Sequence, residues 1–251
     1  MLAVKVFPKK YELISSWLLR FTNNNGTNIN VLSDFLFNNS KLILNDIDKS
    51  LESKDIHQLA EYTDIDSKTI ERLTLKNFLS NFSKEPLNSL KKWKWIIPSG
   101  TKYTIKTNGL LFCSKCLEEK NTIFYIFNRL SWNVICPIHN QLLQNKCPRC
   151  NHQFSPNLKN FNDTFHICNY CSHDFSLDVS DENISTESLE LQIYLNNCIK
   201  EKQIVKSNYN LLDKTLFELF YTIRTLLHFT LAIQKNKRII RLLKEEFKLN
   251  D

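Results

Sequence analysis

Four pairs of cysteine or histidine, each with two residues between its members, constrain this chain more than any other feature of its sequence. The pairs are Cys113/Cys116, Cys136/His139, Cys147/Cys150 and Cys168/Cys171. A C-x2-C turn places two thiolates on one edge of a tetrahedron, so two such pairs complete a four-ligand zinc site. The sequence therefore predicts two Zn2+ ions as cofactors, with all eight side chains as metal ligands.

The order of the pairs leaves open which two pairs share an ion. Residues 122–127, 131–135 and 164–167 are rich in strand-forming side chains and lie between the first two or the last two pairs. Turns joined by short strands favour neighbouring pairs sharing an ion, as in tandem zinc ribbons. The last two pairs also repeat the pattern C-x-x-C-x-H-x-F. An interleaved pairing stays open, because the entropy of loop closure grows only slowly with loop length.

Other chemistry for these cysteines fits less well. The chain begins without the apolar core of a secretory signal, so we expect a cytoplasmic protein with reduced thiols. A catalytic zinc keeps one coordination position open, whereas these sets fill all four. The zinc deaminase signature is absent, since no histidine is followed by x-Glu. We therefore predict structural zinc and no enzymatic activity. His152, His166 and His173 are substitute ligands, although exposed positions near the metal explain them more simply.

The N-terminal third has helical spacing. Apolar side chains fall on one face of a helix that begins after Pro8, and a second short helix is expected around residues 31–37. The first face consists of Leu13, Ile14, Trp17, Leu18 and Phe21. Near the other end of the chain, Cys198 has helical spacing with apolar neighbours and is expected in a core. The apolar residues 215–233 contain Glu218 and Arg224, so we expect a buried helix rather than a membrane span.

Residues 59–73 fit a helix-turn-helix. Ala60 is the small residue at the helix crossing, Asp64 tolerates the left-handed conformation of the turn, and Ser67 is the expected N-cap. The second helix presents Lys68 and Arg72 outward. Residues 1–80 carry equal numbers of basic and acidic groups, so docking to a protein stays open beside DNA reading.

The formal charge is +7, and residues 81–150 carry most of the excess, with eleven basic and three acidic groups. Within this segment, lysines surround Trp93 and Trp95 in the run KKWKW, residues 91–95. In such a run, lysines can neutralise the phosphates of a nucleic acid strand and tryptophans can stack on its bases. The alternative is that the tryptophans pack on the first zinc module. The nucleic-acid-binding residues predicted for this surface are Lys91, Lys92, Lys94, Arg129 and Arg149.

These patterns predict a mainly α fold with small β content. The expected domains are a helical helix-turn-helix domain (1–85), a basic tryptophan-rich connector (86–110), zinc ribbon 1 (111–143), zinc ribbon 2 (144–180) and a C-terminal helical region (185–251).

Two motifs resemble the TniQ family. The opening FPKKYELISSWLLR is similar to a family motif of proline, an acidic residue and S-W-L-x-R, here Glu12, Ser16, Trp17, Leu18 and Arg20. The segment from LFCSKCLEE to NKCPRC is similar to the central family motif. Its matching positions are Cys113, Cys116, Leu117, Arg129, Trp132, Cys136, Pro137, His139, Leu142 or Leu143, Cys147, Pro148 and Cys150. The resemblance covers about residues 7–171. The chain departs from the family in its length, shorter than the large DNA-binding members and longer than the smallest, and at Asn151, where a ribbon turn often has glycine.

The resemblance implies an adaptor that selects the target of a transposon. Such a protein recognises DNA or a CRISPR RNA-guided effector complex and recruits the transposon's AAA+ ATPase, with a homodimer as a further possibility and no membrane partner. Two alternatives come from other classes. One is a helix-turn-helix and zinc-ribbon transcriptional regulator that binds DNA directly, and the other is a zinc-dependent nuclease.

Overall fold

The computed structural model describes residues 4–37, 46–80, 95–99, 110–118, 122–154, 156, 165–178, 184–205 and 215–235. This part of the chain is mainly helical, and its β structure consists of isolated antiparallel bridges. The predicted fold class is confirmed. The helices of the N-terminal part are α1 (Ile14–Asn24), α2 (Ile29–Phe37), α4 (Ile47–Ser50), α5 (Ser53–Thr63), α6 (Ser67–Glu71) and α7 (Leu75–Phe78). The central part contains α8 (Ser114–Glu118), η2 (Ile126–Arg129) and η4 (Phe175–Leu177), and α9 (Thr186–Lys200) and α10 (Leu216–Lys235) follow.

The first turn of helix α1 is stabilised by backbone hydrogen bonds to residues elsewhere in the chain. No side chain caps it, and its first amides donate to distant carbonyls: Leu13 to Phe124 (2.9 Å) and Ile14 to Leu73 (3.0 Å). The orphan N–H groups of a helix end need such partners. All five residues of the predicted apolar face are at most 1% exposed, which confirms that prediction.

The turn between α5 and α6 has the predicted conformation. Asp64 is left-handed, with φ 54° and ψ 39°. The predicted cap is wrong by one residue, because the Asp66 carboxylate, not Ser67, accepts from the Thr69 amide at 2.9 Å. That hydrogen bond lowers the pKa of Asp66. Ser67 instead begins α6 and lies 3.2 Å from His57 Nδ1.

The predicted strands are wrong as continuous elements. Within residues 122–127, only Tyr125 forms a bridge, with Glu12, and the chain then turns into the 3-10 helix η2. Asn128 stabilises this turn, since its side chain accepts from the Tyr125 amide at 2.9 Å and donates to Leu111 at 2.9 Å. A short apolar run cannot distinguish a strand from a helical turn.

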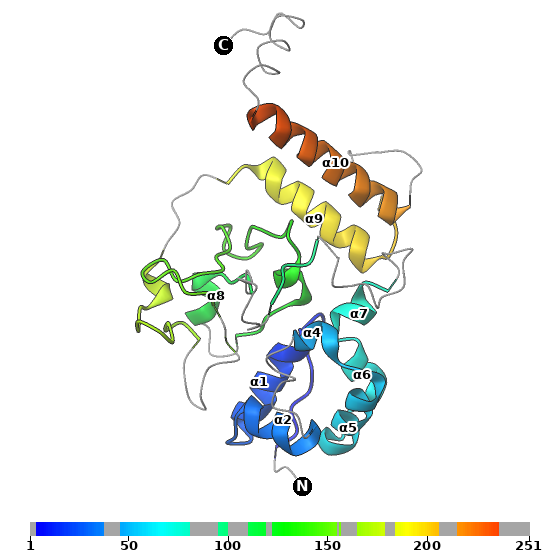
Figure 1. Ribbon diagram of the computed structural model, residues 1–251, viewed down its shortest axis with the longest axis vertical. Coiled ribbons are helices and arrows are strands. Elements are labelled where there is room, and N and C mark those ends of the chain that lie inside the picture. Colours follow the sequence, from blue (N-terminus) through cyan, green and yellow to red (C-terminus); the bar gives the residue numbers. More distant parts are fainter. Residues whose placement is uncertain are drawn as a thin grey trace, which may run out of the picture.

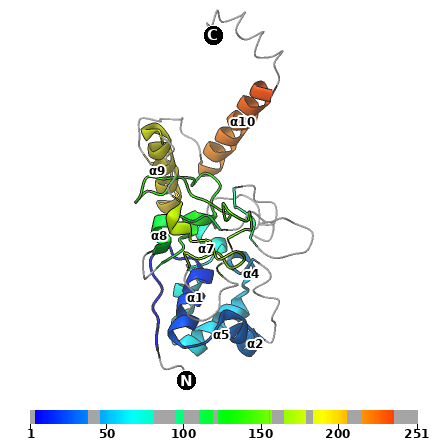
Figure 2. The ribbon, with the colours of Figure 1, turned by 90° about the vertical axis from the view of Figure 1, so that its left-hand side faces the viewer.

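Two hydrophobic cores organise the described residues. One lies among α1, α2, α4, α5 and α6. The other lies under the central part, α9 and the start of α10, and it also contains Leu13, Leu75 and Leu79 from the N-terminal part. Figures 1 and 2 show the N-terminal helices at one end of the molecule and α9 and α10 at the other, with the central part between them.

The C-terminal helices differ in their burial. Helix α9 packs on the central part, and its Cys198 is fully buried, as predicted. Helix α10 exists as predicted, but among its side chains that the structure describes, the buried ones lie in the first turns, where Leu219 and Phe220 are 1% exposed. Farther along, Leu226 and Leu227 are 56% and 51% exposed, and Figure 2 shows this helix diverging from α9. Among the described residues, no helix has the length and apolarity that a bilayer span requires.

Candidate metal centres

The eight predicted ligands gather in two separate groups. Cluster 1 contains Cys113, Cys116, Cys136 and His139, and cluster 2 contains Cys147, Cys150, Cys168 and Cys171. Within each group, the ligand atoms lie within 4.8 Å of one another. The structure therefore brings neighbouring pairs together rather than interleaved ones. The connector between Cys136/His139 and Cys147/Cys150 joins two centres.

The spacing of the donor atoms fits a tetrahedral zinc ion. Zinc–sulfur bonds of about 2.3 Å give a sulfur–sulfur edge of about 3.8 Å. The sulfur atoms of Cys116 and Cys136 are 3.7 Å apart, and in cluster 2 the Cys147–Cys171 and Cys150–Cys168 edges measure 3.6 Å and 3.7 Å. His139 presents Nδ1 to Cys116 Sγ at 3.2 Å. Each group offers a complete set of four donors.

Three of the four ligand pairs lie on the same backbone turn, which we call a knuckle. In the Cys147 knuckle, Cys147 donates its amide to His152 (2.8 Å), and Asn151 donates to Cys147 (2.8 Å). An antiparallel bridge between Lys146 and Gln153 closes the turn. The Cys136 and Cys168 knuckles repeat these bonds at the same offsets, with bridges Ile135 to Leu142 and Ile167 to Asp174. The sequence repeat is thus a structural repeat.

The knuckle explains Asn151. The residue after the second ligand has a positive φ in all three knuckles: 48° at Asn140, 59° at Asn151 and 55° at Ser172. Glycine adopts this conformation freely, and asparagine adopts it more readily than most residues. The departure at Asn151 is therefore compatible with the turn.

The pair Cys113/Cys116 is different, because it lies at the start of helix α8. Leu117 donates its amide to Cys113 at 3.1 Å, as in a helical turn. The buried Gln141 side chain donates to Cys113 Sγ and to Ser114 Oγ, both at 2.9 Å. Gln141 also supplies the carbonyl that accepts from Cys136 (2.8 Å), so it joins both halves of cluster 1. Its role has no sequence signal, since a single glutamine matches no spacing pattern.

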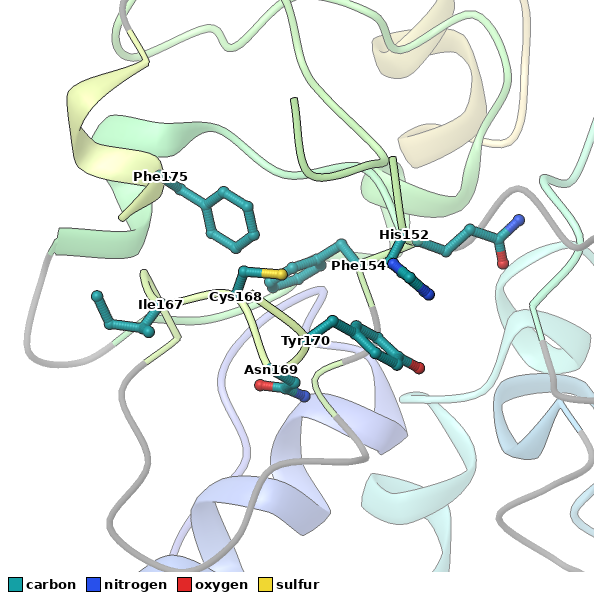
Figure 3. Close-up of a pocket in the computed structure, with 8 residues that line it drawn as sticks. His152, Phe154, Ile167, Cys168, Asn169, Tyr170 and Phe175 are labelled. Carbon is teal, nitrogen blue, oxygen red and sulfur yellow. The ribbon is translucent and has the colours of Figure 1, made fainter. Parts of the chain in front are cut away.

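Aromatic side chains at equivalent positions pack beneath cluster 2. Phe154 and Phe175 occupy the last position of the repeated pattern, and each packs against Phe112, with ring centroids 4.4 Å and 5.0 Å away. On the outer side, the His152 ring stacks on Tyr170 at 4.0 Å. Figure 3 shows Phe175 to the upper left of Cys168, Phe154 behind its sulfur atom, and the His152–Tyr170 stack to the right.

The predicted substitute ligands are not in either cluster. His152 stacks as described, and His173 Nε2 lies 2.9 Å from a carboxylate oxygen of Asp178. His166 is half-buried outside both groups.

The electrostatics of cluster 2 favour a bound cation. Burial raises the pKa of Cys147 to about 12. Burial acts in the same direction on Cys168, but amide donors from Tyr170 and Cys171 outweigh it and lower the pKa of Cys168 to about 7. Four sulfur atoms this close cannot all ionise without compensation, and a divalent cation supplies that compensation.

The prediction that Arg129 lies on a nucleic-acid-binding surface is wrong, because the residue is buried. Its side chain is 1% exposed. The guanidinium donates to Asp46 at 2.6 Å and 2.9 Å, to Asp48 and to the Ile97 carbonyl. A buried cation needs such partners, and sequence reasoning missed both aspartates. Burial raises the pKa of Asp48, whereas at Asp46 the Arg129 charge outweighs burial and lowers the pKa.

The other predicted nucleic-acid residues have different positions. Lys91, Lys92 and Lys94 lie outside the described residues, as does Trp93. Lys68, Arg72 and Arg149 are exposed. Trp95 packs edge-on against Trp132 and Phe220, with centroids 5.5 Å and 5.8 Å away. Packing, and not strand stacking, therefore accounts for Trp95.

The S-W-L-x-R segment builds a buried network. Glu12 is fully buried, and its carboxylate receives Arg20 Nε and Nη2 at 2.8 Å and 2.7 Å. Ser16 Oγ donates to Glu12 at 3.0 Å and accepts from the Phe124 amide at 3.0 Å. Trp17 donates to the Val6 carbonyl at 2.9 Å. The motif thus fastens α1 to the N-terminal segment and the central part.

A sequence model described as TniQ matches residues 3–143, more than half of the chain. The chain belongs to the TniQ family. The match confirms the resemblance seen in the opening and central motifs. It ends before Cys147, so the knuckles of cluster 2 lie outside the matched part of this TniQ protein. No curated protein matches the chain. TniQ proteins are associated with target selection in transposition.

Proposed function

We propose that this TniQ protein is a non-enzymatic adaptor that recognises a transposition target and recruits the transposon's AAA+ ATPase. The target is DNA or a CRISPR RNA-guided effector complex. Two Zn2+ ions, held by the eight ligands of clusters 1 and 2, stabilise the central part. One observation carries this proposal: two four-donor groups lie within a chain of the TniQ family.

The donor sets support a structural role for the metal. A catalytic zinc retains a position for water or substrate, whereas four protein donors complete a tetrahedron. The ions would orient knuckles and cores rather than activate a substrate. The protein would then act through its surfaces. In the N-terminal part, the α5–α6 pair with exposed Lys68 and Arg72 is the proposed helix-turn-helix face.

Metal content tests the structural half of the proposal. Freshly purified protein should contain two equivalents of zinc, measured by elemental analysis. The double substitution Cys147→Ser/Cys150→Ser should remove one equivalent and leave the other. Markedly fewer than two equivalents in the folded wild-type protein would contradict this assignment.

A recruitment assay tests the adaptor role. The AAA+ ATPase of the same transposon is incubated with immobilised target in the presence or absence of this protein. One arm uses target DNA, and the other uses the RNA-guided complex on its DNA. We expect retention of the ATPase that depends on this protein in at least one arm. Equal retention without the protein in both arms would reject the adaptor role.

A further inference from the structure

A basic cleft lies where three distant segments meet. It has a volume of about 410 Å3 and is lined by the N-terminal segment, residues of α6 and α7, and the end of α9. Figure 1 shows α7 beside the end of α9. Five of the lining residues are cationic and exposed: Lys9, Lys10, Arg72, Lys200 and Lys202. None of its described lining residues is acidic.

Ion pairs do not neutralise the five charges, although the charge of Arg72 contributes to the lowered pKa of Asp66. Within the described part of the chain, none of them forms an ion pair. Glu71 and Glu201 are sequence neighbours of Arg72 and Lys200, but neither lines the cleft. Cations gathered in a concave surface reinforce one another's potential, because the low-dielectric walls focus the field.

Aromatic rings hold two of the lysines in place. Lys10 Nζ and Lys200 Nζ lie 5.1 Å and 5.8 Å from the centre of the Tyr11 ring, and Lys200 Nζ also lies 5.0 Å from the Phe127 ring. Such cation–π contacts favour these ammonium positions. Tyr11 has φ 61°, a conformation that costs a non-glycine residue about 1 kcal/mol. The Tyr11 carbonyl accepts from the Ile126 amide at 2.8 Å, which holds this strained residue in place.

Helix dipoles explain only part of the arrangement. Arg72 is the C-cap of α6, while Lys200 ends α9 and Lys202 follows it. Cations are favoured at helix C-termini. Lys9 and Lys10 lie on neither helix, yet they face the same cleft. Their convergence with the other three points to an anionic ligand.

We propose that this cleft binds the phosphate backbone of a nucleic acid strand. The inference deepens the proposed function and rests on it for the source of the strand, which is target DNA or guide RNA. Lysine and arginine contacts to phosphates position a strand without reading its bases. Binding at the cleft should therefore be independent of sequence and sensitive to salt.

Fluorescence anisotropy with the full-length, zinc-loaded protein tests this proposal. The probes are labelled single-stranded DNA, duplex DNA and single-stranded RNA of mixed sequence, each titrated at several salt concentrations. The cleft variant is Lys10→Gln/Lys200→Gln. The matched control, Lys54→Gln/Lys115→Gln, removes the same charge from exposed positions that do not line the cleft.

We expect the cleft variant to bind on the order of tenfold or more weakly to the preferred probe, with a smaller salt dependence. Loss of two phosphate contacts should reduce the slope of log K against log salt by roughly 1.4 on single strands or 1.8 on duplex. The control should keep the wild-type affinity and slope. The preferred probe identifies whether DNA or RNA is the ligand.

Three outcomes would overturn the proposal: no binding by the wild-type protein, unchanged affinity of the cleft variant, or an equal loss in the control. Zinc content and thermal unfolding verify that each variant is folded. Failure of ATPase recruitment with intact nucleic acid binding would reject the adaptor role and leave the cleft assignment standing. Recruitment without any effect of the cleft variant on nucleic acid binding would reject the cleft alone.

Discussion

The guanidinium of Arg129 binds groups from two separate parts of the chain. It contacts Asp46, the N-cap of α4, Asp48 within α4 and the Ile97 carbonyl, while its own backbone ends η2. Asp48 also accepts from the Ser15 amide at 3.0 Å, which extends the network to α1. A buried ion pair contributes little net stability compared with apolar packing, but loss of one partner leaves an uncompensated charge.

Replacement of Arg129 tests whether loss of one partner costs more stability than loss of the whole ion pair. Arg129→Met should lower the free energy of unfolding by about 3–5 kcal/mol, because Asp48 remains buried without its partner. Urea denaturation of the zinc-loaded protein measures the loss. The triple substitution Arg129→Met/Asp46→Asn/Asp48→Asn should recover much of it. Arg149→Met, at an exposed position, should change stability by no more than about 0.5 kcal/mol. Equal effects at Arg129 and Arg149 would contradict the buried network.

At the scale of elements, the knuckles show one backbone solution used three times. Each needs a left-handed residue immediately after its second ligand, because only then does the chain return to accept from the first ligand's amide. Asparagine serves at two of these positions and serine at the third. The Cys113/Cys116 pair avoids this requirement because a helix follows its first ligand.

The left-handed residue of the Cys147 knuckle gives a graded prediction. Asn151→Gly should preserve or slightly increase stability, whereas Asn151→Ala should cost about 1 kcal/mol relative to glycine, because alanine resists a positive φ. Thermal unfolding measures the stability of each variant, and the rate of zinc transfer to a coloured chelator measures how firmly each variant holds the metal. Faster zinc loss from the glycine variant than from the alanine variant would contradict the assigned conformation.

Two substitutions at the α5–α6 turn distinguish the observed cap, Asp66, from the cap expected from the sequence, Ser67. Asp66→Ala should destabilise the protein, because the Thr69 amide loses its side-chain acceptor and keeps only the Asp66 carbonyl. Ser67→Ala removes a hydroxyl that accepts no helix amide and should have the smaller effect. Thermal unfolding of both variants under identical conditions measures the difference. A larger effect at Ser67 would restore the cap expected from sequence.

Local spacing allowed much of this structure to be predicted. The eight ligands, the apolar face of α1 and the left-handed Asp64 all follow from residues a few positions apart. Contacts between distant residues could not be predicted this way. Arg129 meets Asp46 across 83 residues, and nothing near it distinguishes a buried arginine from a phosphate-binding one. The cleft lysines were missed for the same reason, since Lys10 and Lys200 converge only in the fold.

At the scale of the whole molecule, residues of the N-terminal part help to build the core of the central part. Leu13, Leu75 and Leu79 leave the N-terminal helices and pack in the core beneath the metal centres. Helix α9 is bound to the segment that leads into Cys136, because the Gln192 side chain bonds both the amide and the carbonyl of Ile135, at 2.9 Å and 2.7 Å.

Metal removal should therefore act unevenly. A strong chelator should expose residues 110–178 to protease first, because structural zinc supplies on the order of 10 kcal/mol per site in small peptides. The helices of residues 14–37 should resist longer, since their own core contains no ligand. Limited proteolysis with mass spectrometry follows the order of cleavage, and zinc readdition is the control. Unchanged resistance of residues 110–178 after complete zinc removal would contradict the structural role.

The bond from the Leu13 amide to the Phe124 carbonyl has a consequence for synthesis. A ribosome releases α1 long before it releases residue 124, so the first turn of that helix must wait for its partner. Until then, Leu13 and the buried carboxylate at Glu12 lack the surroundings that the finished protein provides. Nascent chains truncated before this point should depend on chaperones, and completion of the N-terminal part should coincide with emergence of residues 124–126.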